Sequence, residues 1–286
     1  MIPASFDYHR PATVAEAIAL MSEHGEEARL LAGGHSLLPA MKLRFNTPTH
    51  LIDIGALPDF AVIREEGDTL VIGAGATHAS LETSALLQSS ASALAQAAAV
   101  IGDVQVRNRG TLGGSLAHAD PSADYPAALL ALSAEIVLQG EDGKRTVSAA
   151  EFFIDLFTTA LEAGELVVEV RLPKQGAAKS AYQKFPQPAS RFAVVGCAAL
   201  LEQEGDRCTR ARVAFTGVTG AAFCDEALGA FLVGKQLSPQ VIDEAAAMAG
   251  AELDPEDINA DNFAAADYRA HLMCVYAKRV LQPLTS

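Results

Sequence analysis

The spacing of apolar residues in the first part of the chain predicts strands alternating with a helix. The runs "FDYHR" (6–10) and "ARLLAGG" (28–34) are typical of short strands. Between them, "TVAEAIALMSEHG" (13–25) has helical spacing, with Thr13 as its cap and Gly25 as its end. A βαβ-like beginning follows from this order.

The middle of the chain combines two hairpin patterns with alanine-rich helical runs. Alternating apolar positions around a polar turn predict a hairpin, and continuous Ala and Leu predict a buried helix. The predicted elements are a strand at "THLIDIG" (49–55), a hairpin at "FAVIREEGDTLVIGAG" (60–75), one helix at "SALLQSSASALAQAAAVI" (84–101) ending at Gly102, a helix at "YPAALLAL" (125–132), a hairpin at "AEIVLQGEDGKRTVS" (134–148) and a strand at "LVVEVRLP" (166–173).

The pattern changes near residues 175–180, where a polar, glycine-containing joint, "KQGAAKS", interrupts it. Three β-rich runs and three helical patterns follow. The expected strands are "AYQKF" (181–185), "RFAVVGCAALLE" (191–202) and "TRARVAFTGV" (209–218), and the expected helices lie around 225–232, 238–249 and 267–281. We therefore expect one unit over residues 1–176 and a second over 177–286.

Composition excludes several kinds of protein. The chain has 286 residues, half of them apolar, which is typical of a well-packed globular protein of two or three units. Its net charge of −14 disfavours nucleic acid as a partner. No apolar run is long enough to cross a membrane, and the opening "MIPASFDYHRPAT" lacks the blocks of a signal peptide, so a cytoplasmic location is expected.

Common catalytic and metal-binding signatures are missing from the sequence. The four cysteines form no CxxC pair, which predicts ordinary reduced thiols and no zinc or iron–sulfur ligands. The P-loop, HExxH and GxSxG patterns do not occur, and no pair of histidines has helical ligand spacing. The segment "VIGAGATHAS" (71–80) imitates a dinucleotide-binding turn, but His78 stands where the third glycine is required. We interpret it as a strand-to-helix turn in which glycine relieves backbone strain and Thr77 caps the helix.

Two glycine loops carry the candidate chemistry. "LLAGGHSLLP" (30–39) and "GTLGGSLAHADPSAD" (110–124) both place a Gly–Gly pair beside small hydroxyl residues. Each loop alone is explained by a permissive turn. Together they can turn several backbone N–H groups, and the hydroxyls of Ser36, Thr111 and Ser115, toward the two phosphates of one pyrophosphate. Asp124 can then accept hydrogen bonds from a ribose, or alternatively cap the following helix.

The same residues carry a resemblance to a known family. "LLAGGHSLLPAMKLR", "VRNRGTLGGSLAHADPSADYPAALLAL" and "AYQKFPQPASRFAVVGCAALL" resemble the FAD-binding medium subunit of molybdenum hydroxylases, the carbon monoxide dehydrogenase and xanthine dehydrogenase family. The resemblance implies an α/β FAD-binding domain of the vanillyl-alcohol-oxidase type, with subdomains of about 1–56 and 57–176. A C-terminal α+β domain with a three-stranded antiparallel sheet and helices would follow it.

The resemblance also implies the residues that contact FAD. Lys184 matches a lysine beside the flavin ring, and Phe192 a position where relatives carry an aromatic over that ring. Ser115 stands where some relatives have asparagine, and the cysteine-bearing insertion of the benzoyl-coenzyme-A-reducing branch is missing. The implied cofactor-binding residues are Leu31, Ala32, Gly33, Gly34, His35, Ser36, Leu37, Ile101, Gly102, Gly110, Thr111, Gly114, Ser115, His118, Asp124 and Lys184.

In that family, this subunit accepts electrons from two 2Fe-2S clusters of a small subunit and passes them to an external acceptor. A large subunit carries the molybdenum cofactor, and a dimer of heterotrimers is expected. No catalytic acid, base, nucleophile or metal ligand is then needed on this chain. A stand-alone FAD oxidase or dehydrogenase of the same fold, and an assembly subunit without flavin, are the alternatives.

Overall fold

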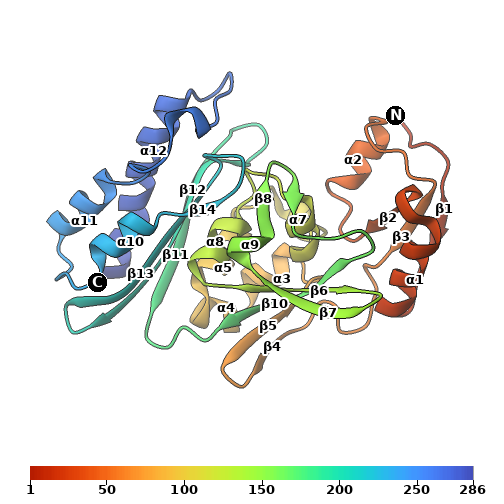
Figure 1. Ribbon diagram of the computed structural model, residues 1–286, viewed down its shortest axis with the longest axis horizontal. Helices are drawn as coiled ribbons and strands as arrows, with labels where there is room; N and C mark the ends of the chain where they lie inside the picture. Colours follow the sequence, from red (N-terminus) through yellow and green to blue (C-terminus); the bar gives the residue numbers. More distant parts are fainter. Residues whose placement is uncertain (286) are drawn as a thin grey trace.

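A computed structural model describes residues 1–285; Ser286, the last residue of the second expected unit, lies outside it. The N-terminal part is a three-stranded parallel sheet of order β1-β3-β2, at the right of Figure 1. Helix α1 covers one face of this sheet, and Thr13 and Gly25 bound it as predicted. The elements are β1 (Asp7–His9), α1 (Val14–His24), η1 (Gly25–Glu27), β2 (Ala28–Leu31), α2 (Leu37–Lys42) and β3 (His50–Asp53).

The central part is built on a five-stranded antiparallel sheet of order β4-β5-β10-β6-β7. Both predicted hairpins are present in it. Its strands are β4 (Ile63–Glu66), β5 (Thr69–Gly73), β6 (Glu135–Gly140), β7 (Gly143–Ser148) and β10 (Leu166–Pro173). The other elements are α3 (His78–Thr83), α4 (Ala85–Ser90), α5 (Ser92–Ala99), α6 (Val104–Arg107), α7 (Leu112–His118), α8 (Tyr125–Ala131), α9 (Ala149–Phe152), β8 (Phe153–Asp155) and β9 (Thr158–Thr159).

The alanine-rich run is two helices rather than the single helix predicted. The chain breaks at Ala91, whose φ of −151° is not helical. The break lets the amide of Ala93 donate to Ser180 Oγ at 3.1 Å, and Ser92 Oγ donates to the Ser180 carbonyl. A contact with a distant strand thus overrides a continuous helical propensity.

The C-terminal sheet has four antiparallel strands, where the sequence predicts three. Its order is β11-β12-β13-β14, and the fourth strand pairs two residues with the end of β13. Two residues carry no alternation that a sequence pattern can reveal. The elements are β11 (Lys179–Pro186), β12 (Ala193–Glu204), β13 (Arg207–Thr216), β14 (Phe223–Cys224), α10 (Glu226–Leu232), α11 (Pro239–Ala247), η2 (Pro255–Asp257), α12 (Ala266–Leu281) and η3 (Gln282–Thr285).

Both faces of this sheet are buried, which joins it to the central part. Alternate residues of β12 belong to different cores: Ala198 and Leu200 belong to the core shared with α5 and α8, whereas Cys197 and Ala199 belong to the core shared with α10, α11 and α12. All four cysteines are free thiols, as predicted. Within residues 1–285 no helix is both long and apolar enough to cross a bilayer.

Candidate functional site

The first glycine loop follows β2 directly and leads into α2. Gly34 has a φ of +75°, a conformation that glycine adopts without the cost of a Cβ. Within residues 1–285 the backbone N–H groups of residues 33–37 donate no hydrogen bond. Successive free amides in a turn form a concave binding site for an anion, and this loop offers five of them.

The second glycine loop has a different structure, because the protein itself uses its amides. Thr111 caps α7 and accepts a hydrogen bond from the Gly114 amide at 3.2 Å. The amides of Leu112 and Gly113 donate to the carbonyls of Ala76 (2.9 Å) and Ala74 (2.8 Å). This loop therefore presents hydroxyl groups, rather than free N–H groups, to a ligand.

The two loops touch each other. A Cβ on Gly33 would lie 2.2 Å from the carbonyl oxygen of Arg109 and 2.8 Å from the Cα of Gly110. A Cβ on Gly110 would in turn lie 2.4 Å from Nε2 of His78. Gly33 and Gly110 are therefore required for close packing, and neither has a positive φ.

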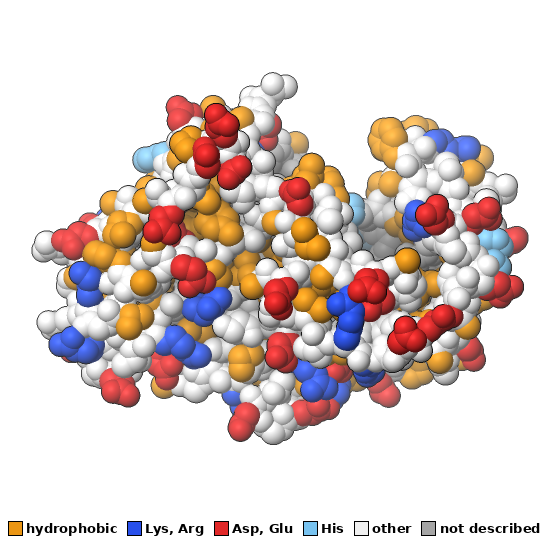
Figure 2. All heavy atoms as spheres, viewed as in Figure 1, with side chains coloured by type: hydrophobic (Ala, Val, Ile, Leu, Met, Phe, Trp, Pro, Cys, Tyr) orange, Lys and Arg blue, Asp and Glu red, His pale blue; other side chains and the backbone are white. Residues whose placement is uncertain are grey.

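The loops form the floor of a cavity of about 1290 Å³. Figure 2 shows the molecule hollowed between the N-terminal elements at the right and the central part. This volume exceeds the roughly 300–1,000 Å³ of small-molecule sites, so it suits an extended ligand. The predicted residues that line it are Ala32, Gly33, Gly34, His35, Ser36, Leu37, Ile101, Gly110, Thr111, Gly114, Ser115, His118 and Asp124, and Phe192 lines it too.

Three predicted residues lie outside the cavity lining. Leu31 is the last residue of β2, two positions before Gly33 of the first loop. Gly102 has a φ of +49°, and its carbonyl accepts a hydrogen bond from the Arg191 guanidinium at 3.2 Å. Lys184 is buried behind the cavity wall, where its ammonium group contacts Asp124.

Asp124 is the centre of a buried polar network. Its carboxylate accepts hydrogen bonds from the Tyr182 hydroxyl at 2.6 Å and from Lys184 Nζ at 2.9 Å. Lys184 also donates to the carbonyl of Arg191 at 2.6 Å. Burial raises the pKa of Asp124, whereas the charge of Lys184 and the Tyr182 hydrogen bond act to lower it. The side chain makes no capping hydrogen bond to α8, so the alternative interpretation of Asp124 as a helix cap is wrong.

The buried side chain of His78 packs against the second glycine loop. The ring Nδ1 of His78 lies 2.7 Å from the hydroxyl of Tyr125, and its Nε2 faces Gly110. Burial, with smaller effects from His35 and Arg107, lowers the pKa of His78 from 6.5 to about 4. His78 is therefore neutral at physiological pH.

The segment that imitates a dinucleotide turn has the predicted strand-to-helix structure. Thr77 caps α3 by accepting a hydrogen bond from the Ser80 amide at 3.2 Å. Its glycines, however, do not relieve a positive φ. A Cβ on Gly73 or Gly75 would lie 2.3 or 2.9 Å from the carbonyl oxygen of Phe60. Their role is close packing against that backbone.

Other parts of the wall were not found from the sequence. Phe157 lines the cavity, its ring centroid is 5.2 Å from that of His118, and its amide donates to Ala119 at 3.2 Å. Arg145 and Glu165, also lining residues, form an ion pair at 2.6 Å across the sheet. Arg145 lies on β7 and Glu165 directly precedes β10, in segments whose sequences carry no motif typical of a binding site.

Comparison with known families agrees with this architecture. Residues 4–175 match the FAD binding domain in molybdopterin dehydrogenase, and residues 180–284 match the CO dehydrogenase flavoprotein C-terminal domain. The chain belongs to this family of flavoprotein subunits, and the resemblance seen in the sequence is confirmed.

Individual relatives match over nearly their whole length. The carbon monoxide dehydrogenase medium chain of Hydrogenophaga pseudoflava is 43% identical over 284 residues, 98% of this chain and 97% of the relative. The 6-hydroxypseudooxynicotine dehydrogenase complex subunit alpha of Paenarthrobacter nicotinovorans is 37% identical over 98% of this chain and 95% of its own. Among solved structures, quinoline 2-oxidoreductase from Pseudomonas putida 86 superposes with a TM-score of 0.93 at 32% identity, covering 100% of this chain and 98% of that one.

Proposed function

We propose that this chain is the FAD-carrying medium subunit of a molybdenum hydroxylase complex, which receives electrons from a partner subunit and passes them to an external acceptor. The observation that carries the proposal is the row of free amides at residues 33–37, which borders a cavity closed from beneath by the second glycine loop. Two carbon monoxide dehydrogenase medium chains match over 98% and 99% of this chain, and a nicotine 6-hydroxylase medium subunit matches over 86% of it.

The residues present fit FAD. The pyrophosphate would lie on the amides of residues 33–37, and a Cβ on Gly33 would push the two loops apart. Thr111 and Ser115, at the start of α7, would add hydroxyl donors from the other side. Amide dipoles would thus neutralise the phosphates in a chain whose net charge is −14. When bound, FAD supplies a carrier that takes up and releases one or two electrons.

Asp124 and Lys184 would act as a pair. A carboxylate accepts up to about four hydrogen bonds, so Asp124 keeps capacity for a ribose hydroxyl beyond its bonds to Tyr182 and Lys184. The ammonium of Lys184 is balanced by that carboxylate, so it adds little net charge near the flavin ring. We assign it to holding Asp124 and the loop at Arg191 in place.

The remaining contacts complete the proposed site. His118 and Ile101 line the cavity and would contact the cofactor, while Leu31 and Gly102 would shape it from behind. Phe192 is partly exposed on the cavity wall, where an aromatic ring could cover the flavin.

The FAD-binding unit would comprise residues 1–176, with subdomains of about 1–56 and 57–176 and a vanillyl-alcohol-oxidase-type fold. The second unit would comprise residues 177–286.

The partners follow from the relatives. We propose a large subunit with the molybdenum cofactor and a small subunit with two 2Fe-2S clusters, assembled as a dimer of heterotrimers in the cytoplasm. The β8–β9 hairpin exposes the apolar side chains of Ile154, Leu156 and Phe157, and the Phe157 ring lies beside His118 at the cavity. The small subunit would cover this hairpin, and this contact would bring one of the subunit's 2Fe-2S clusters close to the cavity.

The test is reconstitution. The purified chain should hold one FAD, and a hydroxylatable substrate should reduce it only when both partner subunits are present. Reduction of the isolated chain by such a substrate would support a stand-alone oxidase or dehydrogenase instead. A chain that binds no FAD would overturn the proposal.

A further inference from the structure

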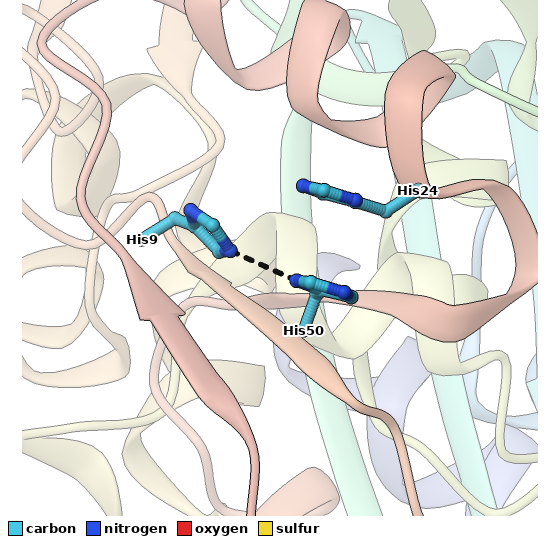
Figure 3. Close-up of side chains that lie close together, drawn as sticks. All are labelled: His9, His24 and His50. Atoms are coloured by element: carbon cyan, nitrogen blue, oxygen red, sulfur yellow. Dashed lines mark hydrogen bonds between the residues drawn. The ribbon is translucent and has the colours of Figure 1, made fainter.

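Three histidines that are far apart in the sequence meet on the N-terminal sheet (Figure 3). Nε2 of His9 lies 3.0 Å from Nδ1 of His50. The ring of His24 stacks on that of His50, with centroids 3.7 Å apart and planes within 2°. One ring nitrogen of each lies within 4.8 Å of the others, and all three residues are half-buried.

The fold explains why they meet. Strands β1 and β3 are parallel with Asp7 opposite His50 and His9 opposite Ile52, so the side chains of His9 and His50 point to the same face. Helix α1 covers that face and ends at His24. The three residues lie on three elements, which explains why no sequence spacing reveals them.

The cluster is separate from the cofactor cavity. None of the three histidines is part of the cavity wall, although Gly25 and Glu26, which follow His24, are. The proposed FAD-binding function therefore does not use these imidazoles.

The ligand chemistry selects one class of ion. Imidazole suits zinc and neighbouring late first-row metals, whereas magnesium and calcium require oxygen ligands. Two nitrogens on a tetrahedral Zn²⁺ are about 3.3 Å apart, because each Zn–N bond is about 2.0–2.1 Å long. The His9–His50 nitrogen separation of 3.0 Å is already close to that spacing. A side-chain rotation of His24 out of its stack would bring in the third nitrogen.

We infer that His9, His24 and His50 form a binding site for one Zn²⁺-class ion, with a fourth position open to solvent. The ion replaces the hydrogen bond between His9 and His50 and ties the end of α1 to strands β1 and β3. Because it binds the folded chain, it stabilises the N-terminal sheet.

Calorimetric titration of the untagged, FAD-loaded chain with ZnCl₂, after removal of metal by chelation, tests the inference. One Zn²⁺ should bind per chain, and MgCl₂ at the same concentration should not. His24→Gln and His50→Gln should each weaken Zn²⁺ by at least about tenfold, since each removes one of three ligands. Zinc should raise the unfolding temperature of the wild type and not that of either variant. The matched control is His271→Gln, an exposed histidine on α12, and it should behave as the wild type.

Three results would overturn the inference. The wild type could bind no zinc, the variant with all three histidines replaced by glutamine could bind it equally well, or binding could be lost with the cavity residues His35 and His118. Should the variants not fold, X-ray absorption of the zinc-loaded wild type decides: three imidazole nitrogens at about 2.0 Å support the site, and a shell of oxygens refutes it.

Discussion

Gly33 and Gly110 lie backbone against backbone, so close that a Cβ on Gly33 would be 2.8 Å from the Cα of Gly110. Gly33 follows a parallel strand of the N-terminal sheet, and Gly110 lies just before helix α7 of the central part. Their contact joins the two parts at the floor of the cavity. The free amides of residues 33–37 are thereby held against the hydroxyls of the second loop.

Gly33→Ala should therefore release FAD. The new methyl would meet the Arg109 carbonyl at 2.2 Å, and backbone atoms cannot rotate away as a side chain can. We expect a loss of about 1–3 kcal/mol in the free energy of unfolding and a clear fall in FAD per chain, measured from flavin absorbance.

Gly67→Ala is the control for this change. Gly67 has a φ of +57° with no atom near its missing Cβ, and it does not line the cavity. It should cost roughly 1–2 kcal/mol of stability through backbone strain alone and leave FAD occupancy unchanged. Equal FAD content in the two variants would contradict the role given to Gly33.

Asp124→Asn should weaken both the fold and FAD binding. The substitution leaves the buried ammonium of Lys184 without its counter-charge, which costs roughly 3 kcal/mol or more. Urea denaturation of the apo chain measures the first effect and FAD titration the second.

Adding Lys184→Met to Asp124→Asn should recover part of the lost stability. The double variant removes the unpaired charge and keeps the hydrogen bond that Tyr182 can donate to the amide oxygen. If the double variant lost as much stability as the Asp124→Asn and Lys184→Met variants together, the two residues would not be coupled.

The fold should lose stability in mild acid because of His78. Its folded pKa of about 4 lies below the ordinary histidine pKa of 6.5, so the unfolded chain binds the extra proton first as pH falls. This contribution is complete above pH 6.5 and is lost toward pH 4, to a total of roughly 3 kcal/mol. Urea denaturation at pH 7 and pH 5 should show a steeper loss for the wild type than for His78→Gln. Identical pH dependence in both would exclude His78 as the cause.

Leu156→Asp should prevent assembly without affecting FAD. Leu156 is 55% exposed in the β8–β9 hairpin, and a charge there would oppose the apolar contact proposed for the small subunit. Co-expression of the three subunits followed by size-exclusion chromatography measures assembly. Val233→Asp, at a site of similar exposure (48%) after α10, should assemble normally. Normal assembly of Leu156→Asp would place the interface elsewhere.

Local patterns predicted most long elements, since the α1 caps, both hairpins and the α12 helix depend on residues near in sequence. Failures occurred where distant residues decide the structure. The break at Ala91 depends on Ser180, and β14 exists only through its pairing with β13.

The candidate site could likewise be predicted only in part from the sequence. Its glycines and hydroxyls were visible in the sequence, because small residues beside each other mark a close backbone approach. The sequence did not reveal that the amides of the first loop are free whereas those of the second are hydrogen-bonded. The carbonyls of Ala74 and Ala76, which accept hydrogen bonds from the second loop, belong to another segment of the chain. Phe157 and the three clustered histidines likewise meet their neighbours only through the tertiary fold.

Strand β12 supplies side chains to two hydrophobic cores at once. A protease cut in the joint at residues 175–178 should therefore leave a nicked chain whose halves stay associated. Deleting everything after the joint would uncover α5 and α8, so the N-terminal piece alone should aggregate rather than act as a minimal flavodomain. In calorimetry the two family domains should melt in one cooperative transition, although family models divide them into two.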